Sequence, residues 1–337
     1  MAEHMRLLIL GGTAWLGGEL ARAARDRGYV VTCLARGMSG PALDGTELVA
    51  ADRTQLGAYD GVRDRDWDAV LDVSRQPGQV RTAVQALRGR ASRFLFVSSG
   101  NVYADHRAPG QDESSPLLPP LASEVMESMA EYGEAKVACE RHVLDGFGPD
   151  AVLVARVGLI GGPGDWSGRT GYWPLRFARP AAPDGAVLVP DAPDLPTSVI
   201  DVRDLAGWLV DAAQTRTAGI FNAAGPAIRL ADHLETARQV AGHTGPVVEV
   251  DKTWLAEQGV QPWMGERSLP LWLDDPDWFG FNARDSGAAR RAGLVTRPLA
   301  ETLADTLAWE RGQDPDRVRR AGLTAADERA LLDAWRR

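Results

Sequence analysis

The stretch from Arg6 to Gly17 reads RLLILGGTAWLG, and it decides the fold. Its first five residues are mostly large and apolar, as in a short buried strand, and glycines follow at positions 11, 12 and 17. Residues 15–27 then have the apolar spacing of a helix. A strand, a glycine-rich turn and a helix in this order bring the free N–H groups and the positive dipole end of the helix to the turn. The stretch therefore predicts a loop that binds the pyrophosphate of a dinucleotide.

The residues of this loop expected to contact the cofactor are Gly11, Gly12, Thr13, Trp15, Leu16 and Gly17. Ala14 takes the place at which a middle glycine is common. The second predicted strand ends just before Arg36, where an acidic residue would bind the ribose 2′-hydroxyl of NAD. Because an arginine can instead pair with the 2′-phosphate of NADP, we expect NADP(H) to be preferred, with NAD(H) as the alternative. Asp52 and Arg53, just past the third strand, are expected at the adenine edge.

Short apolar strands alternate with helical segments through the first half of the chain. The predicted strands cover residues 6–10, 30–34, 47–50, 69–72, 93–97 and 151–155, and the predicted helices cover 15–27, 79–87 and 123–145. Strands that are apolar on both faces and separated by helices predict a parallel sheet covered by helices. A further helix ends near residue 213, a strand covers 219–222, and the last helix follows Thr324 as N-cap and runs through Trp335.

Two stretches rich in Gly or Pro, residues 104–123 and 161–196, interrupt this alternation. We expect an α/β protein in which a Rossmann-type doubly wound parallel sheet forms a dinucleotide-binding domain from residues 5–158 and 198–224. A smaller mixed domain for the substrate would comprise residues 159–197 and 225–337. The loop 104–123 is expected to cover the site.

Composition excludes several classes of protein. The chain has 337 residues, a formal net charge of −9 at pH 7 and no basic run, which argues against a nucleic-acid partner. Its two cysteines, Cys33 and Cys139, give no disulfide framework, and its five histidines lack metal-ligand spacing. No segment reaches the roughly 18 uninterrupted apolar residues of a membrane helix, and no cleavage site follows the first apolar run. We expect a cytoplasmic protein without a bound metal.

Only two of the 37 basic residues are lysines, Lys136 and Lys252, and the other 35 are arginines. Lys136 follows Tyr132 by four residues, so both lie on one face of a predicted helix. A tyrosine hydroxyl ordinarily titrates near about pH 10, and a close ammonium group stabilises its phenolate. Ser99, after the strand at 93–97, would hydrogen-bond a substrate carbonyl. Ser99, Tyr132 and Lys136 are therefore the predicted catalytic residues, whereas His106 and His142 are assigned no catalytic role.

These motifs resemble the extended short-chain dehydrogenases/reductases of the NAD-dependent epimerase/dehydratase group. The serine motif S-S-x-x-V-Y corresponds to Ser98–Tyr103, and the motif Y-x-x-x-K corresponds to Tyr132 and Lys136. Two further family motifs, R-x-x-x-x-x-G-P and D-V-x-D, correspond to Arg156–Pro163 and Asp201–Asp204. The resemblance covers nearly the whole chain and is weakest after residue 225. It implies a homodimer, and it adds Val73, Ser74, Val97, Val157 and Gly158 to the cofactor-binding residues, together with Tyr132 and Lys136.

Departures from the family pattern bear on the substrate. Family dehydratases carry an Asp-Glu pair after the catalytic serine or threonine, where this chain has Gly100 and Asn101, so dehydration is not expected. Family epimerases for sugar nucleotides have an asparagine at the position of Leu159, so a nucleotide sugar is not expected either. Nine of the 11 tryptophans lie at or after Trp166, and one or two of them are expected at the substrate. The predicted substrate-binding residues are Ser99, Asn101, Leu159, Trp166 and Trp173.

The sequence thus predicts an NAD(P)-dependent oxidoreductase that prefers NADPH and acts on a carbonyl/alcohol pair in a small, partly apolar substrate. One alternative is an epimerase that holds its cofactor tightly and oxidises and re-reduces the same carbon. Another is a protein without enzymatic activity that senses dinucleotides or associates with RNA, as the resemblance also allows.

Overall fold

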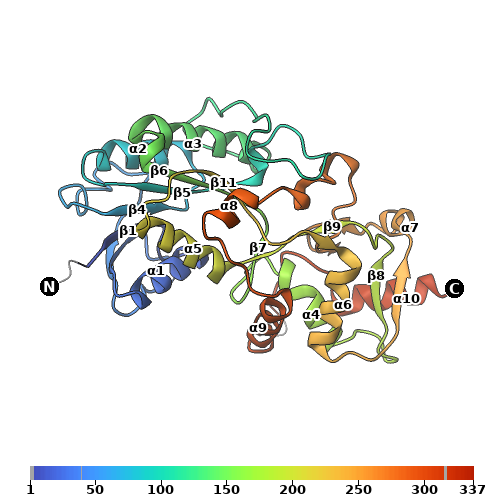
Figure 1. The fold of residues 1–337 in the computed structure, drawn as a ribbon. Coiled ribbons are helices and arrows are strands. Elements are labelled where there is room, and N and C mark those ends of the chain that lie inside the picture. Colours follow the sequence, from blue (N-terminus) through green and yellow to red (C-terminus); the bar gives the residue numbers. More distant parts are fainter. Residues whose placement is uncertain (1–3, 39, 315–316) are drawn as a thin grey trace.

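A computed structural model describes residues 4–38, 40–314 and 317–337 (Figure 1). A seven-stranded sheet with helices on both faces forms one end of the molecule, and a smaller helical region with short strands forms the other. The strands of the sheet are β1 (Arg6–Leu10), β2 (Val30–Ala35), β3 (Glu47–Ala50), β4 (Ala69–Asp72), β5 (Phe94–Ser99), β6 (Val152–Val157) and β11 (Gly219–Ala223). The sequence-based strand ranges differ from these by two residues at most.

All neighbouring strands of the sheet run parallel, in the order β11-β6-β5-β4-β1-β2-β3. Strand order reverses between β1 and β4, because β2 and β3 lie on one side of β1 and the later strands lie on the other. In doubly wound sheets, ligands bind at the carboxyl ends of the strands at this switch point. The predicted α/β Rossmann-type fold is therefore confirmed.

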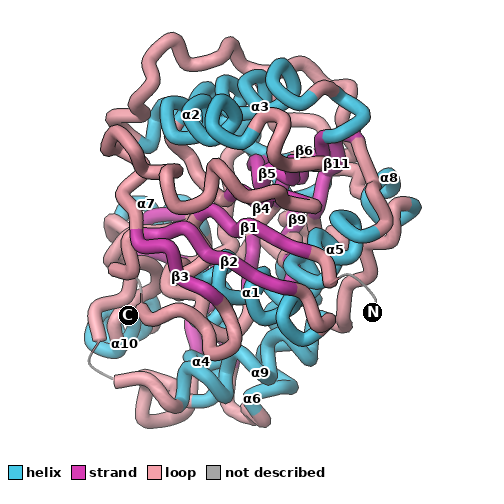
Figure 2. Tube along the Cα trace, turned by 90° about the vertical axis from the view of Figure 1, so that its left-hand side faces the viewer, coloured by secondary structure: helices cyan, strands magenta, loops and turns pink. Residues whose placement is uncertain are grey.

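Helices cover both faces of the sheet because side chains alternate between its faces (Figure 2). In β1, Leu7 and Ile9 pack in one core with α1 (Trp15–Asp26) and α5 (Val202–Gln214). Leu8 and Leu10 pack in the opposite core with α2 (Pro77–Leu87) and α3 (Tyr132–Phe147). Continuous apolar strands are thus buried on both sides, as the sequence predicts.

The predicted helix at residues 123–145 is wrong at its start, because α3 begins only at Tyr132. A capping box explains the difference: the side chain of Ser128 accepts from the backbone of Glu131, and the Glu131 carboxylate accepts from the backbone N–H of Ser128. This exchange fixes a single 3₁₀ turn, and the helix follows it. Tyr132 therefore stands at the first position of α3, at the edge of the sheet where the strands end.

A third apolar core holds the smaller region together. Its helices are α4 (Arg169–Ala178), α6 (Leu230–Ala241), α7 (Lys252–Glu257), α9 (Leu299–Arg311) and α10 (Ala325–Trp335), while α8 (Gly287–Arg291) packs on β11. Parallel β8 (Val187–Pro190) and β13 (Val247–Val250) form the longest strand pair in it. The shorter pairs are β7 (Ile160–Gly161) with β10 (Ile200–Asp201), β9 (Pro196–Thr197) with β12 (Ile228–Arg229), and β14 (Gln261–Pro262) with β15 (Ser268–Leu269). The expected N-cap is present, because the Thr324 side chain accepts from the backbone of Asp327.

The domain boundaries drawn from the sequence remain a prediction. Ala289 and Leu294 fall in the range expected for the substrate domain, yet both pack in the core between the sheet and α5. The segment after residue 280 thus returns to the sheet. Within the described residues, no helix is long and apolar enough to cross a membrane.

Candidate active site

The glycines of the first loop are each required by close packing. Gly11 has a φ of +92°, and a Cβ atom there would lie 2.8 Å from Val73. A Cβ atom at Gly12 would collide with the thiol of Cys33, and one at Gly17 would collide with the backbone oxygen of Gly11. The loop therefore places backbone without side chains at the switch point, where a pyrophosphate can approach the N-terminus of α1.

Ala14 fits this loop despite the family's preference for glycine. It is exposed and is the N-cap of α1, and its backbone N–H donates to Gly11. The next residue, Trp15, joins the loop to the smaller region, because its indole N–H donates to the backbone oxygen of Pro163 at 2.8 Å.

Two adjoining cavities lie beside the glycine loop, and Ala14 and Val73 line both of them. The first, of about 430 Å³, is the loop cavity; the second, of about 260 Å³, is the central cavity. Of the predicted cofactor residues, the loop cavity is lined by Gly11, Thr13, Arg36, Asp52, Arg53, Val73 and Ser74. The central cavity is lined by Trp15, Leu16, Gly17, Val73, Val97, Tyr132, Lys136, Val157 and Gly158. Gly12 lines neither cavity and instead packs on the strand beneath.

The loop cavity carries two exposed arginines, Arg36 and Arg75. Arg53 also lines this cavity, but its guanidinium is already engaged. It forms an ion pair with buried Asp72 at 2.7 Å and donates to the Tyr59 hydroxyl. The Arg53 side chain therefore holds the ends of β3 and β4 together. Arg36 and Arg75 are the exposed cations of this lining, and Arg75 contacts the Met129 sulfur at 3.8 Å; both can meet a phosphate. Hydrogen bonds from the backbone and hydroxyl of Thr54 lower the pKa of Asp52, so this side chain is a carboxylate at neutral pH.

The three residues predicted to be catalytic, Ser99, Tyr132 and Lys136, all line the central cavity. Lys136 is 3% exposed, and its Nζ atom donates to the backbone oxygens of Ser74 and Val97, each at 2.6 Å. The same Nζ lies 4.6 Å from the centre of the Phe96 ring and 6.0 Å from that of Tyr132. Among the described residues no carboxylate pairs with Lys136, so its charge remains available to attract negative charge on Tyr132 or a ribose hydroxyl.

Ser99 is held by its neighbour Asn101. The Ser99 hydroxyl donates to the Asn101 side-chain oxygen at 2.9 Å and accepts from the Asn101 backbone N–H at 3.2 Å. The Ser99 hydroxyl proton must leave this contact to reach a substrate oxygen. For the Asn101 side-chain NH₂ group, by contrast, the described residues offer no acceptor, so it can donate toward the substrate.

A buried ionic network lies directly behind these residues. Arg156 and Glu140 pair at 2.8 Å with both side chains almost fully buried, and Ser98 donates to Glu140 at 2.5 Å. Arg156 also donates to the hydroxyl of Tyr103, which in turn donates to the Asn222 side chain. The network joins α3, β5, β6 and β11, so it fixes the strand end that carries Ser99.

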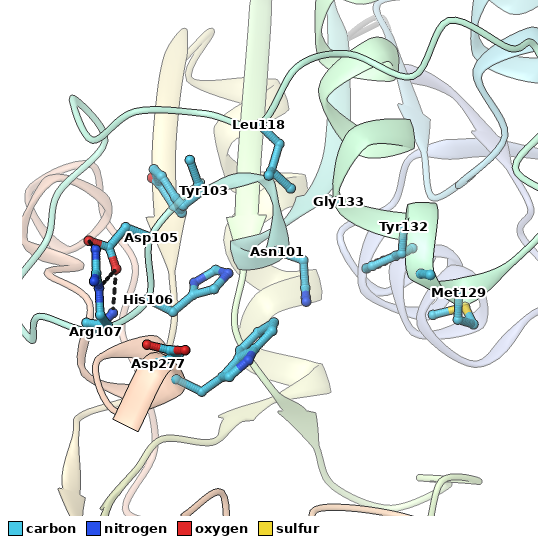
Figure 3. A pocket seen from close by; sticks show the side chains of 13 residues that line it. Asn101, Tyr103, Asp105, His106, Arg107, Leu118, Met129, Tyr132, Gly133 and Asp277 are labelled. Atoms are coloured by element: carbon cyan, nitrogen blue, oxygen red, sulfur yellow. Dashed lines mark hydrogen bonds and ion pairs between the residues drawn. The ribbon is translucent and has the colours of Figure 1, made fainter. Parts of the chain in front are cut away.

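A third cavity, of about 580 Å³, opens beyond Tyr132 (Figure 3) and is called the outer cavity here. Tyr132 is the residue that lines both the central and the outer cavity. The outer cavity is lined by Asn101, Tyr103, Ala104, Asp105, His106, Arg107, Leu118, Met129, Ala130, Tyr132, Gly133, Asp277 and Trp278. The first residues of the loop at 104–123 thus form one wall of it.

Several residues lie elsewhere than the sequence predicted. Leu159 and Trp173 line none of these cavities, because both are buried in the core of the smaller region, where the Trp173 indole donates to the backbone of Pro270. They are corrected from substrate-binding to core residues. Trp166 does line the central cavity, with 57% of its surface exposed. The tryptophan at the outer cavity is Trp278, and His106, which was assigned no role, stacks on it.

The sheet, the loop and the buried lysine beside a tyrosine define a nicotinamide-dinucleotide enzyme, and the residues present fit that cofactor. The chain belongs to the NAD dependent epimerase/dehydratase family, whose model matches residues 7–224. No curated protein sequence matches the chain significantly.

Solved structures resemble the whole chain. A Burkholderia cenocepacia J2315 protein, provisionally assigned as an epimerase, is 22% identical with a TM-score of 0.69, covering 92% of this chain and 99% of that one. UDP-N-acetylglucosamine 4-epimerase from Bacillus cereus is 17% identical with a TM-score of 0.66, covering 94% and 99%. The Bordetella bronchiseptica enzyme WbmG, in complex with NAD and UDP, is 18% identical with a TM-score of 0.64, covering 92% and 96%. At these identities the likeness shows the fold alone.

Proposed function

We propose that the protein is an NADP(H)-preferring oxidoreductase that interconverts a carbonyl and an alcohol in a small, partly apolar substrate. The observation that carries the proposal is the meeting of Ser99, Tyr132 and buried Lys136 in one cavity that continues from the glycine loop, with no carboxylate paired to Lys136 among the described residues. A nicotinamide bound in this cavity supplies or accepts hydride at the substrate carbon.

The side chains supply the remaining chemistry. In the reductive direction, Ser99 donates a hydrogen bond to the substrate carbonyl after releasing Asn101. Tyr132 donates a proton to the same oxygen as negative charge develops there, and it accepts a proton in the oxidative direction. Lys136 stabilises the resulting phenolate with its charge, while two of its three N–H groups remain bonded to Ser74 and Val97. In the part of the chain that the structure describes, no acceptor contacts its third N–H, which would serve the ribose.

Substitution of Tyr132 by Phe tests this mechanism. The wild type and Tyr132→Phe are assayed with NADPH against a panel of aldehydes and ketones, and with NADP⁺ against the matching alcohols, by following NADPH absorbance. We expect kcat to fall by roughly 100-fold or more in Tyr132→Phe. Tyr29→Phe, in the turn before β2, is the matched control and should keep full activity. Unchanged turnover in Tyr132→Phe would overturn the assignment of Tyr132 as the proton donor.

The preference for NADP(H) rests on Arg36. Its exposed guanidinium lines the loop cavity past the end of β2, close to Arg75, and no acidic residue occupies its position. Calorimetric titration of NADP⁺ and NAD⁺ into the wild type and Arg36→Ala tests the preference. NADP⁺ should bind roughly 10-fold to 100-fold more weakly to the variant, because a charged hydrogen bond to the 2′-phosphate is lost. Equal weakening of both cofactors, or tighter NAD⁺ binding in the wild type, would contradict it.

Epimerisation is the second candidate, and the family assignment favours it. The same three side chains can remove and return the proton of one hydroxyl while the carbon is oxidised and then reduced from the other face. Such an enzyme would retain bound nicotinamide through purification and would give an isomer of its substrate without net consumption of cofactor. Stoichiometric NADPH oxidation with accumulation of an alcohol would instead support the reductase.

A further inference from the structure

His106 lies in the outer cavity, on the side opposite Tyr132 (Figure 3). Its ring stacks on Trp278 at 4.3 Å between centroids and 17° between planes, and it meets the edge of Phe281 at 5.3 Å. Two aromatic neighbours in different orientations leave the imidazole little freedom to rotate. In Figure 3 the ring points toward Asn101, which lies between His106 and Tyr132.

Arg284 determines which ring nitrogen of His106 carries the proton. An Nη atom of Arg284 lies 2.7 Å from His106 Nδ1. A guanidinium has N–H donors and no acceptor, so Nδ1 must be the accepting nitrogen and the proton of the neutral ring must be on Nε2. Among the described residues no hydrogen-bond partner is found for Nε2, and His106 is one of the residues that line the outer cavity.

Arg284 is itself held by several contacts. Its guanidinium donates to the Gln111 side chain at 2.8 Å and to the backbone oxygen of Asp105 at 3.0 Å, and it lies 3.9 Å above the Tyr103 ring. Burial, reinforced by the charge of Arg284, lowers the pKa of His106 to about 4. The His106 ring is therefore neutral at pH 7 and keeps one N–H donor.

The charges around the outer cavity do not favour an anion. Asp105 and Asp277 supply two carboxylates, whereas the one guanidinium in the lining, that of Arg107, is paired with Asp105 at 3.0 Å. The side-chain donors that remain in the lining are uncharged, and they include the His106 Nε2–H, the Asn101 side-chain NH₂ group, the Tyr132 hydroxyl and the Trp278 indole N–H. Neutral donors of this kind suit the oxygens of an uncharged group.

We propose that His106 is a substrate-binding residue whose Nε2–H donates to an uncharged hydroxyl or carbonyl oxygen of the substrate, and that Arg284 is the positioning residue that fixes this tautomer. The inference rests on the proposed function, since it concerns the substrate of the same site. It excludes His106 as a general base, because its lone pair is already used by Arg284. It also gives the substrate a second oxygen, apart from the one that Ser99 and Tyr132 contact.

Nitrogen NMR of the histidine rings tests the tautomer without any turnover. The full ¹⁵N-labelled chain is measured, and the spectrum of His106→Gln identifies the His106 signals among those of the five histidines. We expect a neutral Nε2–H ring at pH 7 in the wild type, and a mixture of tautomers in Arg284→Gln. Arg290→Gln, an exposed arginine on α8, should leave the signals unchanged. An Nδ1–H ring, or an imidazolium at pH 7, in the wild type would overturn the proposal.

Small oxygen-bearing probes test the contact itself. Cyclohexanone, cis-1,2-cyclohexanediol and methyl β-D-glucopyranoside are added separately to the protein saturated with NADP⁺, and the His106 Nε2–H signal is followed. At least one should shift it, whereas methylenecyclohexane, which has the shape of cyclohexanone without its oxygen, should not. If none of the three shifts the signal, His106 is not a substrate-binding residue.

Two substitutions then separate binding from mere packing. The side-chain NH₂ of glutamine can take the place of Nε2–H, whereas that of asparagine lies nearer to the place of Nδ1. With a substrate found in the carbonyl panel, His106→Gln should keep kcat/KM within a few-fold, and His106→Asn should lose roughly 10-fold or more, mainly through KM. Equal losses in both variants would contradict the contact. Failure of the proposed function would appear differently, as unchanged turnover in Tyr132→Phe beside an intact His106 tautomer.

Discussion

The Nζ atom of Lys136 lies 2.6 Å from the backbone oxygen of Ser74, so the fifth residue of α3 is tied directly to the segment that follows β4. A second bond of the same length runs from this Nζ to Val97 at the end of β5. The ammonium group thus sits between the ends of two neighbouring strands.

Lys136→Arg should therefore lose most activity although it keeps the charge. The planar guanidinium is larger than an ammonium, and the site is closed by the Phe96 ring and two carbonyl oxygens. We expect kcat to fall by roughly 100-fold while the fold is kept. Lys252→Arg, on exposed α7, is the control and should be fully active. Near-normal turnover in Lys136→Arg would remove Lys136 from the catalytic set.

Two adjacent glycines should respond in opposite ways to alanine. At Gly17 the added methyl group would strike the backbone of Gly11, and overpacking of this kind costs about 1–3 kcal/mol. At Gly18 nothing lies within 4 Å of the added atom, so alanine should be neutral or stabilise α1 by up to about 1 kcal/mol. Thermal unfolding and NADP⁺ titration of both variants check this. Similar destabilisation by both would contradict the loop geometry.

Glu140→Gln should destabilise the protein strongly. The change keeps the shape of the side chain but leaves the Arg156 guanidinium buried without its counter-charge, which costs about 3 kcal/mol or more. Asp145→Asn removes an exposed carboxylate from the same helix and should change the free energy of unfolding by no more than about 0.5 kcal/mol. Urea denaturation measures both variants. If Glu140→Gln were as stable as Asp145→Asn, the ionic network would not hold the strand ends.

Stability should fall as the pH is lowered from 7 to 5, partly because of His233. Complete burial lowers the pKa of His233 to about 4, below the usual value near 6.5 of an unfolded chain. Between these values the unfolded state binds more protons, so acid favours unfolding, by about 2 kcal/mol at pH 5 relative to pH 7. His106, whose pKa is also about 4, adds an effect of the same sign.

His233→Leu should remove the His233 part of this pH dependence and should not itself cost much, because no partner for Nε2 is found among the described residues. Free energies of unfolding from urea denaturation at pH 7 and pH 5 provide the comparison. An unchanged difference between the two pH values in the variant would show that His233 titrates normally in the folded protein.

The parts of the molecule that the sequence predicts well are those decided by local chemistry. The glycines of the first loop and the alternating apolar strands follow from backbone conformation and burial. The pairing of Tyr132 with Lys136 follows from helix geometry alone. All of these are properties of neighbours in the chain, so a single sequence carries them.

The errors arise where distant segments meet. The His106 ring is held by Arg284 and Trp278, which lie more than 170 residues later in the chain. No local sequence pattern indicates such a contact. Trp173 looked like a wall residue because it lies in a glycine-rich segment, yet tertiary packing buries it completely. The predicted start of α3 is wrong for a local reason, since the capping box at Ser128 places a 3₁₀ turn before the helix.

The unequal burial of the two lysines also governs how the protein can be labelled. Lys136 is nearly inaccessible, whereas the Lys252 side chain is 57% exposed on the smaller region. Amine-reactive dyes should therefore attach to a single side chain, that of Lys252 on α7. A fluorophore on Lys252 would therefore mark the smaller region and leave Lys136 unmodified.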